Sequence, residues 1–141
     1  MSRVDEMVTV LRQWQALERR SMDDTAQIME KSGSPFIRLL MEIIRHDSVM
    51  HHRVEQFLVD TVTKDSIAVT REDIAQVWEQ IEAHDRNERK TIQLGEELRK
   101  KAWTPVHKLL LEYLVKDESK HDTLLQQLDA MKVDLGRSSG A

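Results

Sequence analysis

The sequence aligns with itself without a gap when it is shifted by 70 residues, and this internal repeat constrains the fold more than any other feature. Residues 11–58 and 81–128 give 48 aligned pairs, of which 11 are identical. Unrelated segments of ordinary composition would give about three. The chain is therefore expected to contain one structural unit twice. The identical pairs are Glu18/Glu88, Arg19/Arg89, Lys31/Lys101, Pro35/Pro105, Leu39/Leu109, Leu40/Leu110, Glu42/Glu112, Asp47/Asp117, His51/His121, Gln56/Gln126 and Leu58/Leu128.

The repeated unit is expected to be a helical hairpin, because helix-breaking residues are few and fall between long helical patterns. The chain has only 4 Gly and 2 Pro in 141 residues. Ser34 and Pro35 suit the N-cap and first turn of a helix, and Thr104 and Pro105 repeat this start. The pattern predicts four helices, at about 3–31, 35–62, 71–101 and 105–132.

Long helices with short connections pack as bundles, so the predicted fold is an all-α four-helix bundle. The bundle would occupy residues 1–135 as a duplicated helical hairpin, with hairpins at about 3–62 and 71–132, and a disordered polar tail would follow at 136–141. A short connection between the hairpins favours up-down-up-down topology over a long crossover. Pairing of hairpins between two chains, in a homodimer, stays open as an alternative.

The composition excludes several classes of protein. The chain has no Cys, so disulfides, thiolate metal sites and a cysteine nucleophile are excluded. A formal net charge of -4 with mixed signs does not indicate a nucleic-acid partner. We expect no membrane span and, because the first residues lack the apolar core of a signal peptide, a cytoplasmic location. Carboxylate, imidazole and hydroxyl groups remain for chemistry.

Each predicted helix has an apolar stripe at helical spacing, and polar side chains interrupt these stripes. The apolar positions are Val4, Met7, Leu11, Trp14 and Ile28, then Leu40, Ile43, Ile44, Val54 and Leu58, then Ile74, Val77, Ile81 and Leu98, then Leu110, Tyr113, Leu114, Leu124, Leu125 and Leu128. The polar interruptions are Glu18, Asp47, His51, Glu88, Asp117, Glu118 and His121. A buried carboxylate costs several kcal/mol, so these groups are expected to be paired or to bind a metal ion.

The repetition of these polar residues is the reason to treat them as a site. A single Glu on a helix is usually solvated, and a single His on an apolar face is usually a core residue. Small residues near the candidate ligands, Ser21, Thr25, Thr91 and Gly95, would leave room for an ion, water or O₂. His84, four residues before Glu88, is expected to pack in the core or to donate to that carboxylate.

This arrangement resembles the ferritin-like carboxylate-bridged di-iron bundles and, within them, the rubrerythrin-like branch. The family pattern is a Glu on one helix and Glu-x-x-His on the next, given twice. The second half of this chain matches completely, with Glu88, Glu118 and His121. In the first half Glu18 and His51 match, but position 48 holds Ser in place of a ligating Glu. The resemblance covers residues 3–132.

The missing Glu leaves the ligand set open. Asp47 precedes His51 by four residues, so both side chains can face inward, and Asp117 has the same relation to His121. A symmetric set would therefore use Glu18, Asp47, His51, Glu88, Asp117 and His121. A further alternative has one metal position occupied and the other empty.

The resemblance implies two metal ions per site, with Fe(II) oxidised by O₂ or peroxide. Carboxylate and imidazole ligands favour iron or manganese over copper. Tyr113, the only Tyr, would hydrogen-bond a ligand or relay electrons, although it also suits simple packing on the helix. Without Cys the chain has no rubredoxin-type electron-transfer domain, so electrons would come from Fe(II) itself or from an external donor.

Three other interpretations compete with the di-iron one. A metal-free bundle would satisfy the inward Glu, Asp and His in a polar network and would act as a structural or interaction module. A mononuclear or zinc site would use part of the same set. Hemerythrin-like oxygen binding needs more core His than the two placed here, His51 and His121.

Overall fold

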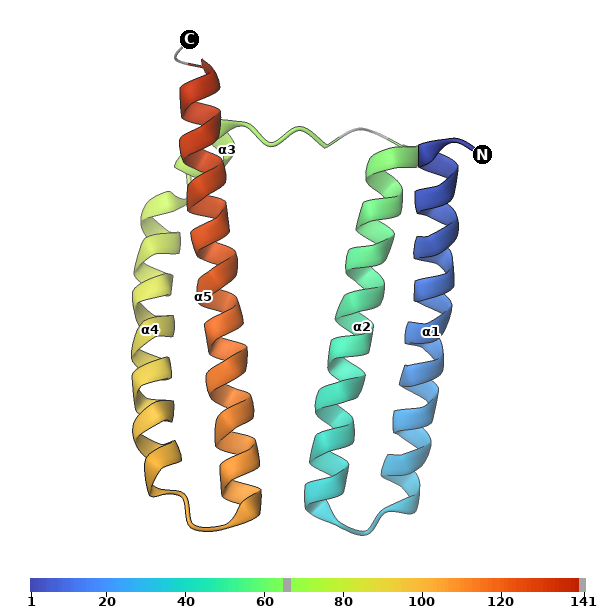
Figure 1. The fold of residues 1–141 in the computed structure, drawn as a ribbon, viewed down its shortest axis with the longest axis vertical. Coiled ribbons are helices and arrows are strands. Elements are labelled where there is room, and N and C mark those ends of the chain that lie inside the picture. The colour runs from blue at the N-terminus through green and yellow to red at the C-terminus, as the bar shows by residue number, and fades with distance from the viewer. Residues whose placement is uncertain (65–66, 140–141) are drawn as a thin grey trace. The chain divides into compact units, whose positions relative to one another are not determined.

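The computed structural model of the chain describes residues 1–64 and 67–139, and every regular element in them is an α-helix (Figure 1). The helices are α1 (Arg3–Lys31), α2 (Pro35–Thr63), α3 (Arg71–Ala75), α4 (Trp78–Lys101) and α5 (Pro105–Ser139). The all-α prediction is confirmed for these residues. None of the described helices combines the length and the apolar character that crossing a membrane requires.

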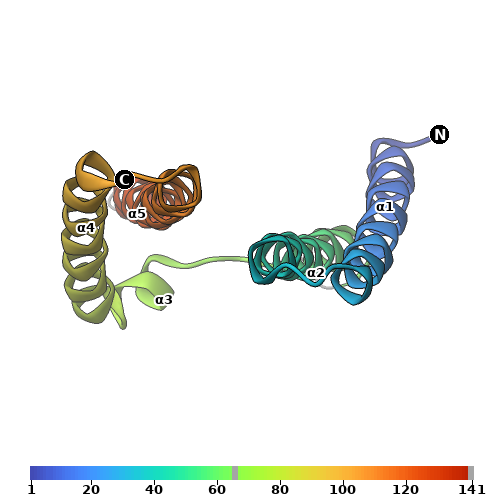
Figure 2. The ribbon, with the colours of Figure 1, turned by 90° about the horizontal axis from the view of Figure 1, so that it is seen from below.

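The chain divides into two compact units, Met1–Ile67 and Ala68–Ala141. In the first unit α1 packs beside α2, and we call this pair hairpin one. In the second unit α4 packs beside α5, and we call this pair hairpin two. Both views show the partners of each pair running side by side (Figure 1, Figure 2). The predicted hairpin repeat is therefore present as two helix pairs.

Side-chain caps begin the helices where the sequence predicts. Ser2, Ser34 and Thr104 accept hydrogen bonds from the backbone N–H groups three residues later, at 3.1, 3.3 and 3.1 Å. Thr70 and Asp73 form a complete capping box at the start of α3. Each cap satisfies an N–H group that has no partner inside the helix, which fixes the first turn.

Two predicted boundaries are wrong. The helix expected over 71–101 is interrupted, because α3 ends at Ala75 and α4 starts at Trp78. At the interruption the Val77 N–H bonds to the Ile74 carbonyl at 3.2 Å, a tighter turn than an α-helix makes. The last helix, expected to end near Lys132, continues to Ser139. Residues 136–139 of the expected tail are therefore helical, and residues 140–141 lie outside the described part.

The short helix α3 packs against the C-terminal end of α5. Ile74 is buried there, with 3% of its surface exposed. A Cβ atom at Gly136 would lie 3.1 Å from Arg71 Nε, so the absence of a side chain at Gly136 permits this close approach. The last turns of α5 therefore belong to the fold of hairpin two.

The apolar core of each hairpin is smaller than the apolar stripes predict. Leu11 and Ile74 are buried as expected, but so are Val59 and Val115, which lie outside the predicted stripes. Trp14, assigned to a stripe, is 52% exposed, and Leu124 is 62% exposed. Two packed helices bury side chains only along the face where they touch, so the rest of each apolar stripe stays exposed within a hairpin.

Candidate metal centre

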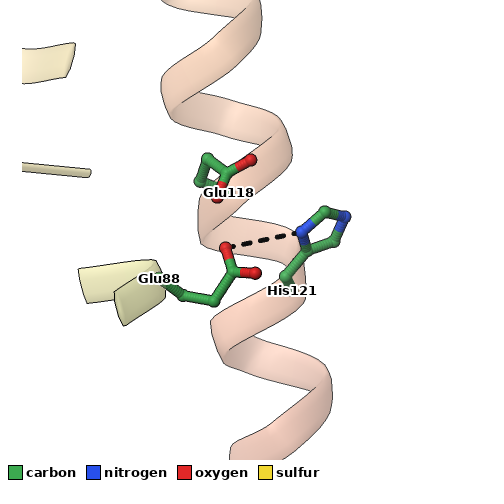
Figure 3. Close-up of side chains that lie close together, drawn as sticks. All are labelled: Glu88, Glu118 and His121. Atoms are coloured by element: carbon green, nitrogen blue, oxygen red, sulfur yellow. Dashed lines mark ion pairs between the residues drawn. The ribbon is translucent and has the colours of Figure 1, made fainter. Parts of the chain in front are cut away.

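Three candidate ligands converge in hairpin two. Glu88 reaches from α4 toward Glu118 and His121, which lie one turn apart on α5 (Figure 3). One ligand atom from each residue lies within 4.8 Å of the others, and within the described residues this is the single group of such compactness. The Glu-x-x-His spacing produces this convergence because residues three apart share a helix face.

The two oxygens of Glu88 have different surroundings. Oε1 lies 2.8 Å from His84 Nε2, while Oε2 lies 3.5 Å from His121 Nδ1. Oε2 is buried and receives no hydrogen bond from an N–H or hydroxyl group. The residue as a whole is 7% exposed. A buried carboxylate oxygen with lone pairs to spare is an available ligand for a cation.

Glu118 is held against Glu88 by its surroundings. Thr91 Oγ1 donates a hydrogen bond to Glu118 Oε2 at 2.9 Å, and the same hydroxyl also donates to the Glu88 carbonyl at 2.7 Å. The hydroxyl of Thr91 thus links one oxygen of Glu118 to the backbone of α4 at Glu88. Thr91, predicted to leave space for an ion, instead positions one of the carboxyl groups.

The interaction between the two carboxyl groups shifts their pKa values in opposite directions. A hydrogen bond from Glu118 lowers the pKa of Glu88, against the effect of burial, and His121 and His84 lower it further. The same hydrogen bond raises the pKa of Glu118, and burial adds to that increase. The interaction therefore favours the charged form of Glu88 and the neutral form of Glu118, as expected for two carboxyl groups held close together.

Asp117 contacts the other side of the His121 ring. Its Oδ2 lies 3.7 Å from His121 Nε2, and its Oδ1 pairs with Lys120 Nζ at 3.1 Å. Asp117 is outside the compact group, so its geometry suits orienting the imidazole better than binding the same ion. Tyr113 is half-buried on the same helix, five residues before Glu118.

Hairpin one reproduces part of this geometry. Glu18 Oε2 lies 3.5 Å from His51 Nδ1, the same distance as in the corresponding pair of hairpin two. The Ser48 hydroxyl donates to the Ser21 hydroxyl at 2.8 Å. These two serines occupy the repeat positions of Glu118 and Thr91. A short hydroxyl pair thus replaces the carboxyl and hydroxyl pair of the other hairpin.

The two Asp residues of the symmetric ligand set lie outside the compact group of hairpin two. Asp47 is half-buried on α2, and neither it nor Asp117 belongs to the compact group. The space beside Gly95 is also filled, because a Cβ atom there would lie 2.7 Å from Val115 Cγ2. Gly95 serves close packing of α4 on α5, and the expectation that it leaves room for an ion is wrong.

Two residues near the candidate ligands have roles that differ from or add to the predictions. The side chain of His84 is 63% exposed and pairs with Glu88, so it is a donor to the site and not a core residue. The sequence did not indicate Glu55, yet Glu55 is buried on α2, and the charges of Glu18 and His51 affect its pKa. Its repeat partner is Leu125, an apolar stripe position. The sequence signal for a buried Glu55 is a glutamate whose repeat position holds an apolar residue, Leu125.

Comparisons with protein-family models, with curated proteins and with solved structures find no match for this chain. The resemblance to ferritin-like proteins therefore stays a prediction from the sequence. Since a fold by itself does not establish a function, the function is argued from the site.

Proposed function

We propose that the chain binds a divalent transition-metal ion through Glu88, Glu118 and His121. The observation that carries this proposal is the convergence of one ligand atom from each within 4.8 Å, around a buried Glu88 oxygen that has no N–H or hydroxyl donor. A bound cation would neutralise Glu88 and compete with a proton for Glu118, whose pKa is raised.

The donor set favours iron, manganese or zinc. It offers one imidazole nitrogen and carboxylate oxygens, with no sulfur ligand, and such sets suit these ions better than soft ones. The surrounding residues support the ligands: His84 holds one oxygen of Glu88, and Asp117 faces the second nitrogen of His121. Partners of this kind fix the orientation of metal ligands and strengthen binding.

We propose iron as the ion and Fe(II) oxidation by O₂ or peroxide as the reaction, on the basis of the resemblance to rubrerythrin-like proteins. When bound, iron supplies a one-electron Fe(II)/Fe(III) couple whose electrons pass to the oxidant. Glu88 and Glu118 provide the negative charge that favours the higher oxidation state. Tyr113 is proposed as a relay or hydrogen-bonding residue on the same helix as two of the ligands.

The four-helix bundle is part of the same proposal. The repeat supports it, as does the apolar surface that each hairpin, taken by itself, leaves uncovered. Large exposed apolar side chains such as Trp14 and Leu124 favour burial in an assembly. A second copy of the chain would serve the same purpose, and sedimentation analysis of the purified protein distinguishes a monomer from a homodimer.

Metal titration tests the proposed site. Protein freed of metal with a chelator is titrated with Mn²⁺, and then with Fe²⁺ under nitrogen. Glu88→Gln, Glu118→Gln and His121→Ala are each expected to weaken binding at hairpin two by about tenfold or more. Glu112→Gln is the matched control, because Glu112 is an exposed Glu on the same helix that pairs with Lys116. Unchanged affinity in all three ligand variants would refute the proposal.

A separate measurement tests the reaction. Iron-loaded protein is expected to consume O₂ or peroxide faster than free Fe²⁺ at the same concentration, and Tyr113→Phe is expected to slow this without changing metal affinity. If the loaded protein binds iron but does not accelerate oxidation, the redox part of the proposal fails and the binding part stands.

A metal-free structural role is the second candidate, and one observation favours it. His84 contacts Glu88 and Thr91 donates to Glu118, and the raised pKa of Glu118 favours its neutral form, so much of the polar group is satisfied without an ion. Under this alternative the amide of Glu118→Gln still contacts the Glu88 carboxyl group. The stability of this variant is then the same as that of the wild type, with or without metal. A metal-dependent rise in melting temperature that Glu118→Gln abolishes would exclude it.

A further inference from the structure

We infer that hairpin one has a cation site of its own, formed by Glu18, His51 and Glu55. In this site Glu55 supplies the second carboxylate, which the serine at position 48 does not provide. The inference extends metal binding to the half of the repeat whose family motif is incomplete. Its test is separate from that of the Glu88 site.

The two hairpins differ by a reciprocal exchange of residue types. On α2 position 48 is Ser and position 55 is Glu, whereas the repeat positions on α5 are Glu118 and Leu125. Each candidate site therefore takes one Glu from the first long helix of its hairpin, and one Glu and one His from the second. The carboxylate lies three residues before His in hairpin two and four residues after His in hairpin one. Both spacings place the two side chains on the same helix face.

Burial distinguishes Glu55 from an ordinary surface glutamate. The residue is 3% exposed, and its Oε1 is buried without a hydrogen-bond partner in the structure. Glu18 Oε2 is also buried without a hydrogen-bond partner, although it lies 3.5 Å from His51 Nδ1. Buried carboxylate oxygens without donors are unfavourable, so two of them in one hairpin require an explanation.

The charges of Glu18 and His51 affect Glu55, which lies one helical turn after His51 on α2, a helix that packs on α1. Burial raises the pKa of Glu55, the charge of Glu18 raises it further, and His51 opposes the increase. Glu18 contacts His51 at 3.5 Å, and both are near enough to Glu55 for their charges to shift its pKa. With only a half-exposed imidazole to balance two buried carboxyl groups, a divalent cation is the ligand that would compensate both.

The two sites are expected to differ in affinity. One ligand atom each from Glu88, Glu118 and His121 already lies within 4.8 Å of the others. Glu18, His51 and Glu55 are not gathered so closely. Side chains in hairpin one would have to adjust on binding, which costs conformational freedom. The Glu18, His51 and Glu55 site is therefore expected to be the weaker of the two.

The test uses the full chain with the other site disabled by Glu88→Gln and Glu118→Gln. Mn²⁺ is added to this protein, and bound ion is measured from the loss of the free Mn²⁺ signal in electron paramagnetic resonance. The doubly substituted protein is expected to keep one saturable Mn²⁺ site. Adding Glu55→Gln is expected to weaken that site by about tenfold or more. Adding Glu42→Gln, an exposed glutamate on the same helix, is expected to change it less than about twofold.

The outcomes separate this inference from the proposed function. Glu55→Gln changes only an oxygen to a nitrogen, and circular dichroism checks that the helices are intact. The inference is overturned if the protein lacking Glu88 and Glu118 carboxylates binds no Mn²⁺, or if Glu55→Gln leaves its affinity unchanged. If Glu88→Gln and Glu118→Gln do not reduce binding in the first place, the proposed function fails, while a loss caused by Glu55→Gln still supports the site in hairpin one.

Discussion

Replacing Glu55 with Leu is expected to stabilise the metal-free protein, although the substitution removes a native residue. Glu55 is 3% exposed and its Oε1 lacks a donor, so at neutral pH the folded state contains a buried, uncompensated carboxyl group. Leaving such a group unsatisfied costs about 1–3 kcal/mol, and the substitution removes this cost. Leu is also the residue at the repeat position, Leu125, so the side chain suits this place in a hairpin.

The pH dependence of the effect has a definite sign. Because burial, and then Glu18, raise the pKa of Glu55, the folded state binds a proton more readily than the unfolded state. Stability from this group is therefore present below the unfolded-state pKa and is lost as pH rises through the higher folded-state pKa. The advantage of Glu55→Leu over the wild type is expected to be smallest in mild acid and to reach its full size at neutral pH.

Chemical unfolding with urea in the presence of a chelator measures this effect. The free energy of unfolding of Glu55→Leu at pH 7 is expected to exceed that of the wild type by about 1–3 kcal/mol. Glu42→Leu is the control, since the Glu42 side chain is 56% exposed and its replacement should change stability by about 0.5 kcal/mol or less. A Glu55→Leu protein that is less stable than the wild type at pH 7 would refute the reasoning. The same substitution is expected to abolish metal binding in hairpin one, so the variant gains stability and loses the proposed function of this hairpin.

Three further predictions concern hairpin two. Gly95→Ala is expected to destabilise it by about 1–3 kcal/mol through overlap with Val115, and Val115→Ala in the same chain should recover part of that loss in a double-mutant cycle of urea unfolding. Thr91→Val removes the donor to Glu118 and should weaken Mn²⁺ binding about tenfold, with helicity unchanged by circular dichroism. Asp117→Asn should weaken binding by a similar factor, about tenfold, if the carboxylate orients His121; equal titration curves for the variant and the wild type would show that it does not.

Local sequence signals predict the helix starts well. Serine or threonine caps are short-range features, and at Ser34 and Thr104 they act together with the proline that follows. The interruption at residues 76–77 has no such signal, because neither Gly nor Pro occurs there. The interruption accompanies the burial of Ile74 and the packing of α3 on α5, a contact between residues far apart in the chain.

The candidate site was predictable where the repeat is exact and not where it has diverged. Identical positions identify the pairs Glu18 with His51 and Glu88 with His121, and the structure gives both pairs the same separation of 3.5 Å. Identity between the two halves does not indicate Glu55, because the repeat position of Glu55 is Leu125. Burial of one glutamate depends on three-dimensional packing, which residue spacing alone does not reveal.

The contact between α3 and α5 bears on where the chain can be shortened or extended. The final residues read as a dispensable polar tail, and a crystallographer trimming the protein would cut after Lys132. The structure shows Gly136 on a helix against Arg71, next to the burial site of Ile74. Removing the last helical turns would expose that isoleucine to solvent and open α3 to proteases. An affinity tag is better placed before Ser2, where the chain is exposed.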